Sequence, residues 1–307
     1  MKILVISSNL IGDNILSTGA IQYFLEKYPD SKFTFIVGPT AFQIYENFPN
    51  LDKRIKIKKK KYNFHWLDIF VKCLFIKWDI IIDFRSSLIS YFLFPKKRYI
   101  FKKKKNLHHL DQLKKMFNFD CSNLIVHNSF IENEKANKLL NNDVKKIVIC
   151  PGGNWPPKIW PVELFNELMK KIISKYNNVK FIIVGSNNEK NIYLNEVTKS
   201  INEKYILDLM GETLTLTSAI MKKCDLFIGN DSGLMHLSAA SKISTIGLFG
   251  PTDDKIYAPR GNKCFVIRTK ESFENLRNNI RKYNESYMKT ISVNDILQLV
   301  EEEKLLL

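Results

Sequence analysis

The sequence predicts an α/β protein with two doubly wound domains, in which a mostly parallel sheet lies between helices. Short apolar segments such as Ile3–Ile6 and Lys146–Cys150 alternate with segments of helical periodicity. Strands that are apolar throughout are typical of parallel sheets covered on both faces. The alternation restarts after the polar stretch Glu132–Lys145, so we predict one domain over residues 1–143 and a second over 144–307. Ligands of such folds bind beyond the carboxyl ends of the strands, and we expect a cleft between the two domains.

The first half shows this alternation clearly at its start. In the helix expected over residues 14–27, the side chains of Leu16, Ala20 and Phe24 recur every four residues on one face. A basic and aromatic stretch then runs to about Lys77 without clear periodicity, and we predict no element in it. Strands are expected at Ile3–Ile6, Phe33–Val37 and Asp79–Asp83.

The second half repeats the pattern. A helix is expected from about Pro161 to Tyr176, because proline suits the first helical position, where its missing N–H is harmless. Strands are expected at Lys146–Cys150, Val179–Val184, Asp225–Gly229, Ser244–Phe249 and Cys264–Ile267. A C-terminal helix, which can pack back on the first domain, is marked by Val293, Ile296, Leu297 and Val300.

The composition indicates a globular protein of the cytoplasm. Hydrophobic residues make up 45% of the 307 residues, and no apolar run approaches the roughly 20 residues that cross a bilayer. No secretion signal precedes the first strand. The five cysteines are scattered without a Cys-x-x-Cys pair, which argues against a disulfide framework or a zinc site and fits a reducing compartment.

The net charge of +16 indicates an anionic partner. The charge is concentrated in two runs of the first half, KRIKIKKKK at Lys53–Lys61 and KKRYIFKKKK at Lys96–Lys105. The competing interpretation is a solvated surface that reflects heavy use of lysine throughout the chain.

The segment Gly229-Asn-Asp-Ser-Gly-Leu-Met-His236 joins a strand to the start of a helix. Exposed N–H groups and the helix dipole at such a start favour an anion, and a glycine lets the backbone approach it. In the alternative interpretation Asp231 and Ser232 only cap the helix and His236 packs in the core. The residues alone favour neither.

The segment Pro151-Gly-Gly-Asn-Trp-Pro-Pro-Lys-Ile-Trp-Pro161 also joins a strand to a helix start. Lys158 lies just before that helix, so a cation and helix amides can converge on one phosphate. The alternative is that Trp155 and Trp160 only seal the loop against the domain.

Two further turns follow predicted strands. Asp13, after Gly12, either caps the next helix or acts as a carboxylate base that takes a proton from an attacking hydroxyl. In Phe249-Gly-Pro-Thr252, glycine and proline favour a tight turn and Thr252 can offer its hydroxyl to a ligand.

Several familiar motifs are missing from the sequence. No Gly-x-Gly-x-x-Gly follows the first strand, no Gly-x-x-x-x-Gly-Lys-Ser/Thr occurs, and no metal-bridging Asp-x-Asp pair is evident. His108 and His109 adjoin a basic run, and we expect them on the surface rather than as ligands.

Taken in order, these motifs resemble those of the heptosyltransferases that build the lipopolysaccharide inner core. The resemblance covers most of the chain and is closest over Leu209–Pro259, which reads LMGETLTLTSAIMKKCDLFIGNDSGLMHLSAASKISTIGLFGPTDDKIYAP. The Lys158-Ile-Trp-Pro161 loop, the Gly12-Asp13 turn and the Ile82-Asp83-Phe84 strand end match the family as well.

The resemblance implies a GT-B fold of two Rossmann-like domains, the first binding the acceptor and the second the nucleotide sugar. It implies direct inverting transfer from ADP-heptose without a cofactor or an obligatory metal, with Asp13 as base and Lys158 neutralising phosphate charge. The donor-binding residues implied are Gly12, Asn154, Glu189, Asp231, Ser232, Gly233, Leu234, His236 and Thr252.

The resemblance also gives the basic runs a role. An anionic lipid-linked acceptor at the inner face of the cytoplasmic membrane would be met by a peripheral, monomeric enzyme, each exposed cation contributing about 1 kcal/mol. The cations expected to bind it are Lys58, Lys59, Lys60, Lys61, Lys102, Lys103 and Lys104. The chain departs from the family in two ways, being shorter in the first domain and carrying Gly153 and Asn154 where members often have hydroxyl side chains.

Three alternatives remain. A different nucleotide sugar, or a different glycolipid or polysaccharide acceptor, would keep the enzyme class. A nucleic-acid-binding protein would explain the charge, but no nucleic-acid module is recognisable. A binding protein without catalysis is disfavoured because Asp13, Lys158 and His236 are all present.

Overall fold

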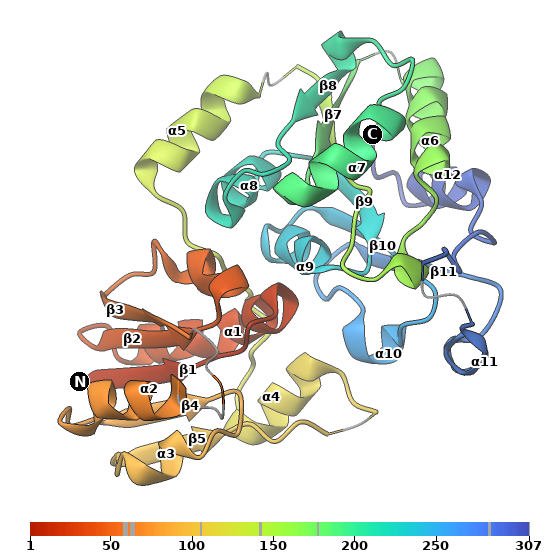
Figure 1. Cartoon of the computed structure of the whole chain (residues 1–307). Helices are drawn as coiled ribbons and strands as arrows, with labels where there is room; N and C mark the ends of the chain where they lie inside the picture. Colours follow the sequence, from red (N-terminus) through yellow and green to blue (C-terminus); the bar gives the residue numbers. More distant parts are fainter. Residues whose placement is uncertain are drawn as a thin grey trace. The chain divides into compact units, whose positions relative to one another are not determined.

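The computed structural model describes residues 1–57, 61, 65–104, 106–140, 143–176, 178–281 and 284–306. The chain divides into two compact units, Met1–Ser129 and Phe130–Leu307 (Figure 1). The division lies before the expected boundary at residue 143. The reason is that α5 (Phe130–Leu139) packs against α8 (Leu214–Met221) in the second unit, where Lys135 pairs with Glu212.

The described part of the first unit contains a five-stranded parallel sheet in the order β3-β2-β1-β4-β5. β1 lies at its centre, with Ile6 beside Ile36 on one side and beside Asp83 on the other. The order of strands reverses between β1 and β4, and such a reversal is where doubly wound sheets bind ligands. The strands are β1 (Lys2–Ile6), β2 (Lys32–Val37), β3 (Leu51–Lys56), β4 (Ile80–Asp83) and β5 (Lys97–Ile100).

Helices pack on both faces of this sheet. α2 and α3 bury Ile69, Cys73 and Ile89 in one core with alternate residues of the strands, such as Leu4 and Ile6. On α1 the predicted apolar stripe is fully buried, and α1 packs against η1 and α4. The helices of the first unit are α1 (Ile11–Lys27), η1 (Pro39–Tyr45), α2 (His65–Leu74), α3 (Ile89–Phe92) and α4 (His109–Phe117).

The stretch in which we predicted no element contains η1, β3 and α2. β3 and β5 are the two edge strands of the sheet; β3 overlaps the first basic run, and β5 lies within the second. Edge strands are half-exposed, so their pattern is not continuously apolar, and lysines on them discourage pairing with other chains. The prediction was wrong here because an apolar run identifies the central strands of a parallel sheet but not its edges.

The described part of the second unit contains a six-stranded parallel sheet in the order β11-β10-β9-β6-β7-β8. In chain order this is the 3-2-1-4-5-6 arrangement of a Rossmann fold read from the other edge, and it reverses between β6 and β9. The strands are β6 (Lys145–Cys150), β7 (Val179–Ile183), β8 (Ile206–Asp208), β9 (Leu226–Asn230), β10 (Ser244–Phe249) and β11 (Cys264–Arg268).

The core of the second unit joins its sheet to α6 and α12. Val293, Ile296 and Val300 of α12 are buried in the same cluster as Phe165 and Ile172 of α6. This packing corrects the expectation that the C-terminal helix packs back on the first domain. The remaining helices are α6 (Val162–Lys175), α7 (Asn187–Val197), α9 (Gly233–Ala240), α10 (Asp254–Tyr257), α11 (Phe273–Asn279), α12 (Val293–Glu302), and the short η3 (Pro156–Lys158) and η4 (Glu203–Tyr205).

Candidate active site

A cavity of about 250 Å³ opens where the first sheet reverses its strand order. Its walls come from the segments that follow β1 and β4, the first turns of α1, the segment after β5, and α4. We call it the Asp13 pocket, and its lining residues are Ser7, Ser8, Asp13, Ser17, Phe84, Arg85, Ser86, Phe101, Lys103 and His109.

Asp13 lies in the first turn of α1 and is half-buried. The residue that precedes the helix is Leu10, and no side-chain cap is present there, so Asp13 is not a helix cap. Its Oδ2 accepts a 3.4 Å hydrogen bond from Ser8 Oγ. The carboxyl group of Asp13 is thus held by Ser8 and faces the pocket.

Asp83 shapes the segment after β4, which forms part of the pocket wall. This carboxylate at the end of β4 is fully buried, and it accepts hydrogen bonds from the backbone N–H groups of Arg85 (2.8 Å) and Ser87 (2.7 Å). Ser87 Oγ donates a third, of 2.6 Å. These bonds fold the chain after β4 so that Arg85 and Ser86 face the pocket, with Ser86 in a left-handed conformation (φ 53°).

His109 also lines the pocket, which corrects the expectation that it lies on the surface. His108 and His109 are 2% and 5% exposed, and His109 Nε2 lies 3.5 Å from Ser17 Oγ. Burial, together with the charge of Lys103, lowers the pKa of His109 to about 3, so the ring is neutral at physiological pH. The helical spacing of His109 with the buried Leu113 and Phe117 was the signal in the sequence.

The predicted cations have different positions. Lys61, Lys102, Lys103 and Lys104 are all exposed, and of these Lys103 also lines the Asp13 pocket. The backbone N–H of Lys104 donates to Gln112 Oε1 at 2.6 Å. The other predicted cations, Lys58, Lys59 and Lys60, lie outside the described residues.

In the second unit, Lys158 and Asp231 form an ion pair at the reversal between β6 and β9. Lys158 Nζ lies 3.3 Å from Asp231 Oδ2, and the two side chains are only 13% and 9% exposed. Lys158 ends η3 in the segment after β6, and Asp231 directly follows β9. Lys158 and Asp231 are 73 residues apart in the chain, yet they meet where two neighbouring strands end.

This arrangement bears on the two interpretations of the Gly229–His236 segment. Ser232 precedes α9, but its side chain makes no capping hydrogen bond, and the Asp231 carboxylate is directed to Lys158. The first N–H groups of α9, at Gly233 and Leu234, are therefore not capped by that serine side chain. His236, on the first turn, is buried at 4% exposure.

Asn230, which the sequence analysis overlooked, ties the two segments together. It is fully buried, and its Nδ2 donates 3.0 Å hydrogen bonds to the carbonyls of Pro151 and Gly152. Its Oδ1 accepts a 2.9 Å bond from the N–H of Trp160. Both polar atoms of the Asn230 side chain are therefore hydrogen-bonded to the backbone of the loop that carries Lys158, and these bonds fix the position of that loop. An amide at the buried end of an apolar strand was the signal in the sequence.

Glu189 has a structural role as well as a place beside the site. Its Oε2 accepts from the N–H and the Oγ of Ser186, both at 2.7 Å, and so caps α7. Its other oxygen, Oε1, would lie 2.3 Å from a Cβ at Gly152, so a larger residue there would displace the Glu189 carboxylate. Asn154, on the same loop, is exposed.

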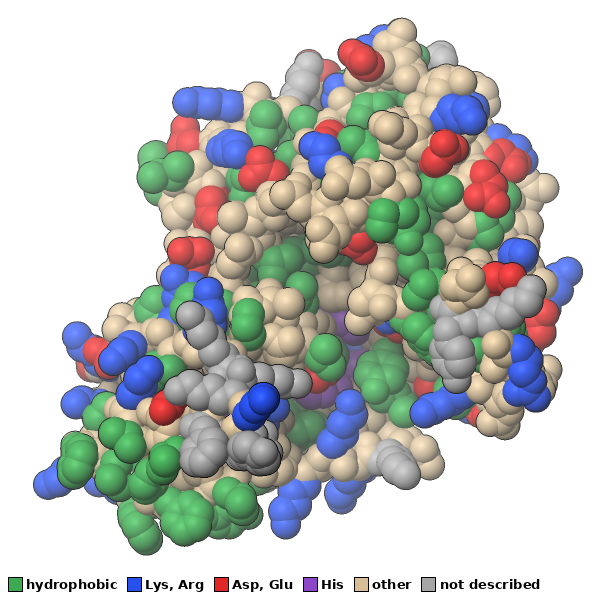
Figure 2. Space-filling model, in the orientation of Figure 1, with side chains coloured by type: hydrophobic (Ala, Val, Ile, Leu, Met, Phe, Trp, Pro, Cys, Tyr) green, Lys and Arg blue, Asp and Glu red, His purple; other side chains and the backbone are tan. Residues whose placement is uncertain are grey.

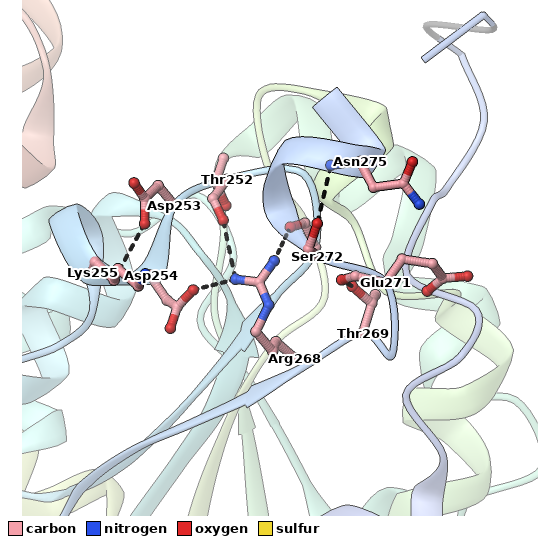
Figure 3. A network of polar contacts seen from close by, with 10 residues as sticks. Thr252, Asp253, Asp254, Lys255, Arg268, Thr269, Glu271, Ser272 and Asn275 are labelled. Atoms are coloured by element: carbon pink, nitrogen blue, oxygen red, sulfur yellow. Dashed lines mark hydrogen bonds and ion pairs between the residues drawn. The ribbon is translucent and has the colours of Figure 1, made fainter. Parts of the chain in front are cut away.

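The turn after β10 is held by Arg268, at the end of β11 (Figure 3). Arg268 donates from Nη2 to the carbonyl of Gly250 at 2.7 Å and from Nη1 to that of Thr252 at 3.4 Å, and it pairs with Asp254. Thr252 Oγ1 is buried and has no hydrogen-bond partner among the described residues, so it is available to a ligand. Arg268 was not predicted.

Among the described residues, no group of three or more His, Cys, Asp or Glu side chains could hold a metal ion. None of the described helices is long and apolar enough to span a membrane.

Comparison with known proteins identifies the family. The model of glycosyltransferase family 9 (heptosyltransferase) matches residues 121–285. The lipooligosaccharide heptosyltransferase 2 of Campylobacter jejuni is 27% identical over 267 residues, covering 82% of each chain. The lipopolysaccharide heptosyltransferase 2 of Escherichia coli is 30% identical over 143 residues, covering 45% of this chain and 40% of the relative.

Solved structures share the whole fold. A family 9 glycosyltransferase from Veillonella parvula superposes with a TM-score of 0.78 at 22% identity, covering 98% of this chain and 96% of that one. E. coli ADP-heptose lipopolysaccharide heptosyltransferase II gives a TM-score of 0.73 at 20% identity over 99% and 100% of the chains. The chain therefore has the predicted GT-B fold, which consists of two doubly wound units. The chain belongs to glycosyltransferase family 9 and is a glycosyltransferase.

Proposed function

We propose that this enzyme transfers heptose from ADP-heptose to the inner core of lipopolysaccharide or lipooligosaccharide. The observation that carries the proposal is that each sheet has polar groups of complementary chemistry where its strand order reverses. One reversal carries the carboxylate of Asp13, and the other carries a nearly buried cation and the start of α9, whose N–H groups the Ser232 side chain does not cap. The names of the relatives support the sugar and the acceptor.

The reaction is a direct displacement with inversion. The acceptor hydroxyl attacks the anomeric carbon of the donor, the bond from that carbon to the diphosphate oxygen breaks, and ADP leaves. Asp13 takes the hydroxyl proton as the oxygen–carbon bond forms, which makes the oxygen a better nucleophile. The neutral ring of His109 and the Ser8 hydroxyl then offer polar contacts without adding positive charge beside Asp13.

When the bond to the anomeric carbon breaks, the leaving diphosphate gains one negative charge, which groups of the second unit would stabilise. Lys158 would use its free donors on phosphate oxygens, and its pairing with Asp231 fixes the ammonium group in advance. The N–H groups at Gly233 and Leu234 and the hydroxyl of Ser232 would complete the phosphate contacts.

The remaining donor contacts are assigned by position. We assign Thr252 Oγ1 to a donor hydrogen bond because it is buried without a partner among the described residues. Asn154 lies on the loop that carries Lys158, and Glu189 lies beside it. We assign these two residues to the ribose of the donor and His236 to the surroundings of its phosphates. Gly12 would let the substrate approach the backbone next to Asp13.

The acceptor is anionic and lipid-linked in this proposal, and the enzyme acts as a peripheral monomer on the cytoplasmic face of the inner membrane. Lys103 is the predicted cation that lines the Asp13 pocket, and it is placed to meet an acidic or phosphorylated acceptor. No cofactor or metal takes part in the proposed step.

The test is single-turnover transfer from ADP-heptose to a deacylated inner-core acceptor, with wild type beside Asp13→Asn. Loss of a catalytic base typically costs about 10² to 10⁴ in rate, so transfer should fall by that factor while ADP binding is unchanged. Asp30→Asn, an exposed carboxylate of the same unit, is the matched control and should behave as wild type.

The outcomes separate the parts of the proposal. Transfer by Asp13→Asn at the wild-type rate would remove Asp13 from its role as base. ADP binding without transfer by the wild type would contradict heptose or this acceptor, and would favour another nucleotide sugar or another glycan.

A further inference from the structure

Exposed apolar side chains gather on one part of the first unit. Of the fourteen large hydrophobic side chains exposed among the described residues, eight lie between residues 67 and 94. Figure 2 shows them as a green area over α2 and α3, at the lower left of the view. We call them the α2–α3 patch: Leu67, Val71, Leu74, Phe75, Leu88, Tyr91, Phe92 and Phe94.

The α2 helix is apolar on two opposite faces. One stripe, at His65, Ile69 and Cys73, is buried against the sheet. A second stripe, beginning at Leu67 and Val71 with the same four-residue spacing, is more than half exposed (57% and 56%). Contact with the sheet explains the first stripe, but nothing in the described fold covers the second.

The α3 segment extends the same patch. The rings of Phe70 on α2 and Phe92 on α3 meet edge to face at 6.3 Å, so the two helices lie side by side. Phe75 and Phe94 are 88% and 83% exposed. Phe94 also has a left-handed backbone (φ 43°), a conformation that a bulky side chain rarely adopts.

Cations border this patch. A second cavity, of about 370 Å³, lies between β3 and α2, and Lys53, Lys56 and Lys72 line it together with Arg54. Asp68 is the one carboxylate among its lining residues. On the other side, the strand β5 carries exposed Lys97 and Arg98, and the guanidinium of Arg98 lies 5.3 Å from the ring of Tyr91.

We infer that the α2–α3 patch docks on an anionic lipid bilayer, with its aromatic and aliphatic side chains inserted at the interface. An apolar surface bordered by Lys and Arg matches acyl chains edged by phosphate headgroups. A second copy of this chain fits less well, because the same cations would then face each other across the contact.

This inference deepens the proposed function and rests on it for the lipid-linked nature of the acceptor. It also accounts for one further contact. Arg85 lines the Asp13 pocket, and its guanidinium lies 5.3 Å from the ring of Trp66 on α2. Arg85 thus connects the pocket with the helix that carries the patch, so a sugar on a membrane lipid would be presented near the Asp13 carboxylate.

The experiment is co-sedimentation of the full chain with vesicles of phosphatidylcholine alone or mixed with phosphatidylglycerol. The wild type should bind the mixed vesicles. The affinity of Phe75→Ser/Phe94→Ser for them should be roughly tenfold lower, because the substitutions remove apolar area from the patch. Both positions are so exposed that folding should not suffer. The matched control is Phe130→Ser/Ile131→Ser, at 79% and 77% exposure in the second unit, which should bind as wild type.

A charge test accompanies it. Lys53→Gln/Lys72→Gln should weaken binding to the mixed vesicles about tenfold, whereas Lys170→Gln/Lys289→Gln, with the same loss of charge in the second unit, should change it much less. If Phe75→Ser/Phe94→Ser bound the vesicles as well as the wild type does, the inference would be overturned. It would also be overturned if the wild type formed a dimer in the absence of lipid and this variant were monomeric. Transfer to the deacylated acceptor should be unchanged in all four variants, so loss of that activity would concern the proposed function instead.

Discussion

The two units share one topology but use the reversal of strand order differently. In the second unit the strand-end segments are tied to each other by buried contacts, through Asn230 and the Lys158–Asp231 pair. In the first unit the corresponding segments surround a cavity that Arg85 and Lys103 border with exposed side chains.

This difference fits two kinds of substrate. A site whose polar groups are fixed before binding loses little entropy when the ligand arrives, and it suits a small donor that must be held in one orientation. An open cavity bordered by long cationic side chains suits a large acceptor that approaches from a surface. We therefore expect mutations in the second unit to change how the donor is held. Mutations in the first unit should change the proton transfer and the access of the acceptor.

The largest effect in the second unit is expected for Lys158→Met. Removing the cation leaves Asp231 nearly buried without its partner and the leaving diphosphate without its counter-charge, so transfer should fall about 10² to 10³-fold. Single-turnover transfer and ADP affinity would be measured together.

The matched control is Lys135→Met. Its ion pair with Glu212 has the same 3.3 Å separation, but the side chains are 48% and 38% exposed. Exposed pairs contribute little, so transfer and stability should stay near wild type. If the two mutations had equal effects, the nearly buried position of the Lys158–Asp231 pair would have no special importance for transfer.

A smaller effect is expected for Asn230→Ala, which removes three hydrogen bonds from a fully buried position. The free energy of unfolding should fall by about 2 to 4 kcal/mol, because two carbonyls and one N–H lose a partner. ADP affinity should fall as well, since the loop of Lys158 is released. Asn166→Ala, another buried amide with two 2.9 Å bonds to carbonyls, should lower stability but not ADP affinity.

The effect expected to be smallest near neutral pH concerns the neutral histidine of the first unit. The pKa of His109 is lowered from 6.5 to about 3, so between these values the unfolded chain binds a proton that the folded chain does not. Stability is therefore retained above about pH 6.5 and falls by up to roughly 1.4 kcal/mol per pH unit as the pH decreases below it. Denaturation at several pH values should show a smaller slope for His109→Gln. An identical slope would mean that His109 does not titrate in this way.

The basic runs show how far sequence patterns reach. Their lysines suggested an anion-binding surface, and the structure places the runs at opposite edges of the sheet, in β3 and β5, with Lys103 lining the Asp13 pocket. The apolar residues of α2 lie in the stretch that lacks clear periodicity, because both faces of this helix are apolar. Whether an apolar residue is buried depends on what covers it, which periodicity alone does not contain.

The sequence by itself determined the central strands, the doubly wound class of both units and the segments that carry Asp13, Lys158 and Asp231. These features depend on local patterns of apolar residues and on turns at strand ends, which are readable within a window of about ten residues. Only the tertiary structure decided the edge strands, the packing of α12 on α6, and the roles of Asn230, His109 and Arg268. Each of these depends on partners far away in the chain, and the free energy of burying a polar group is set by those partners.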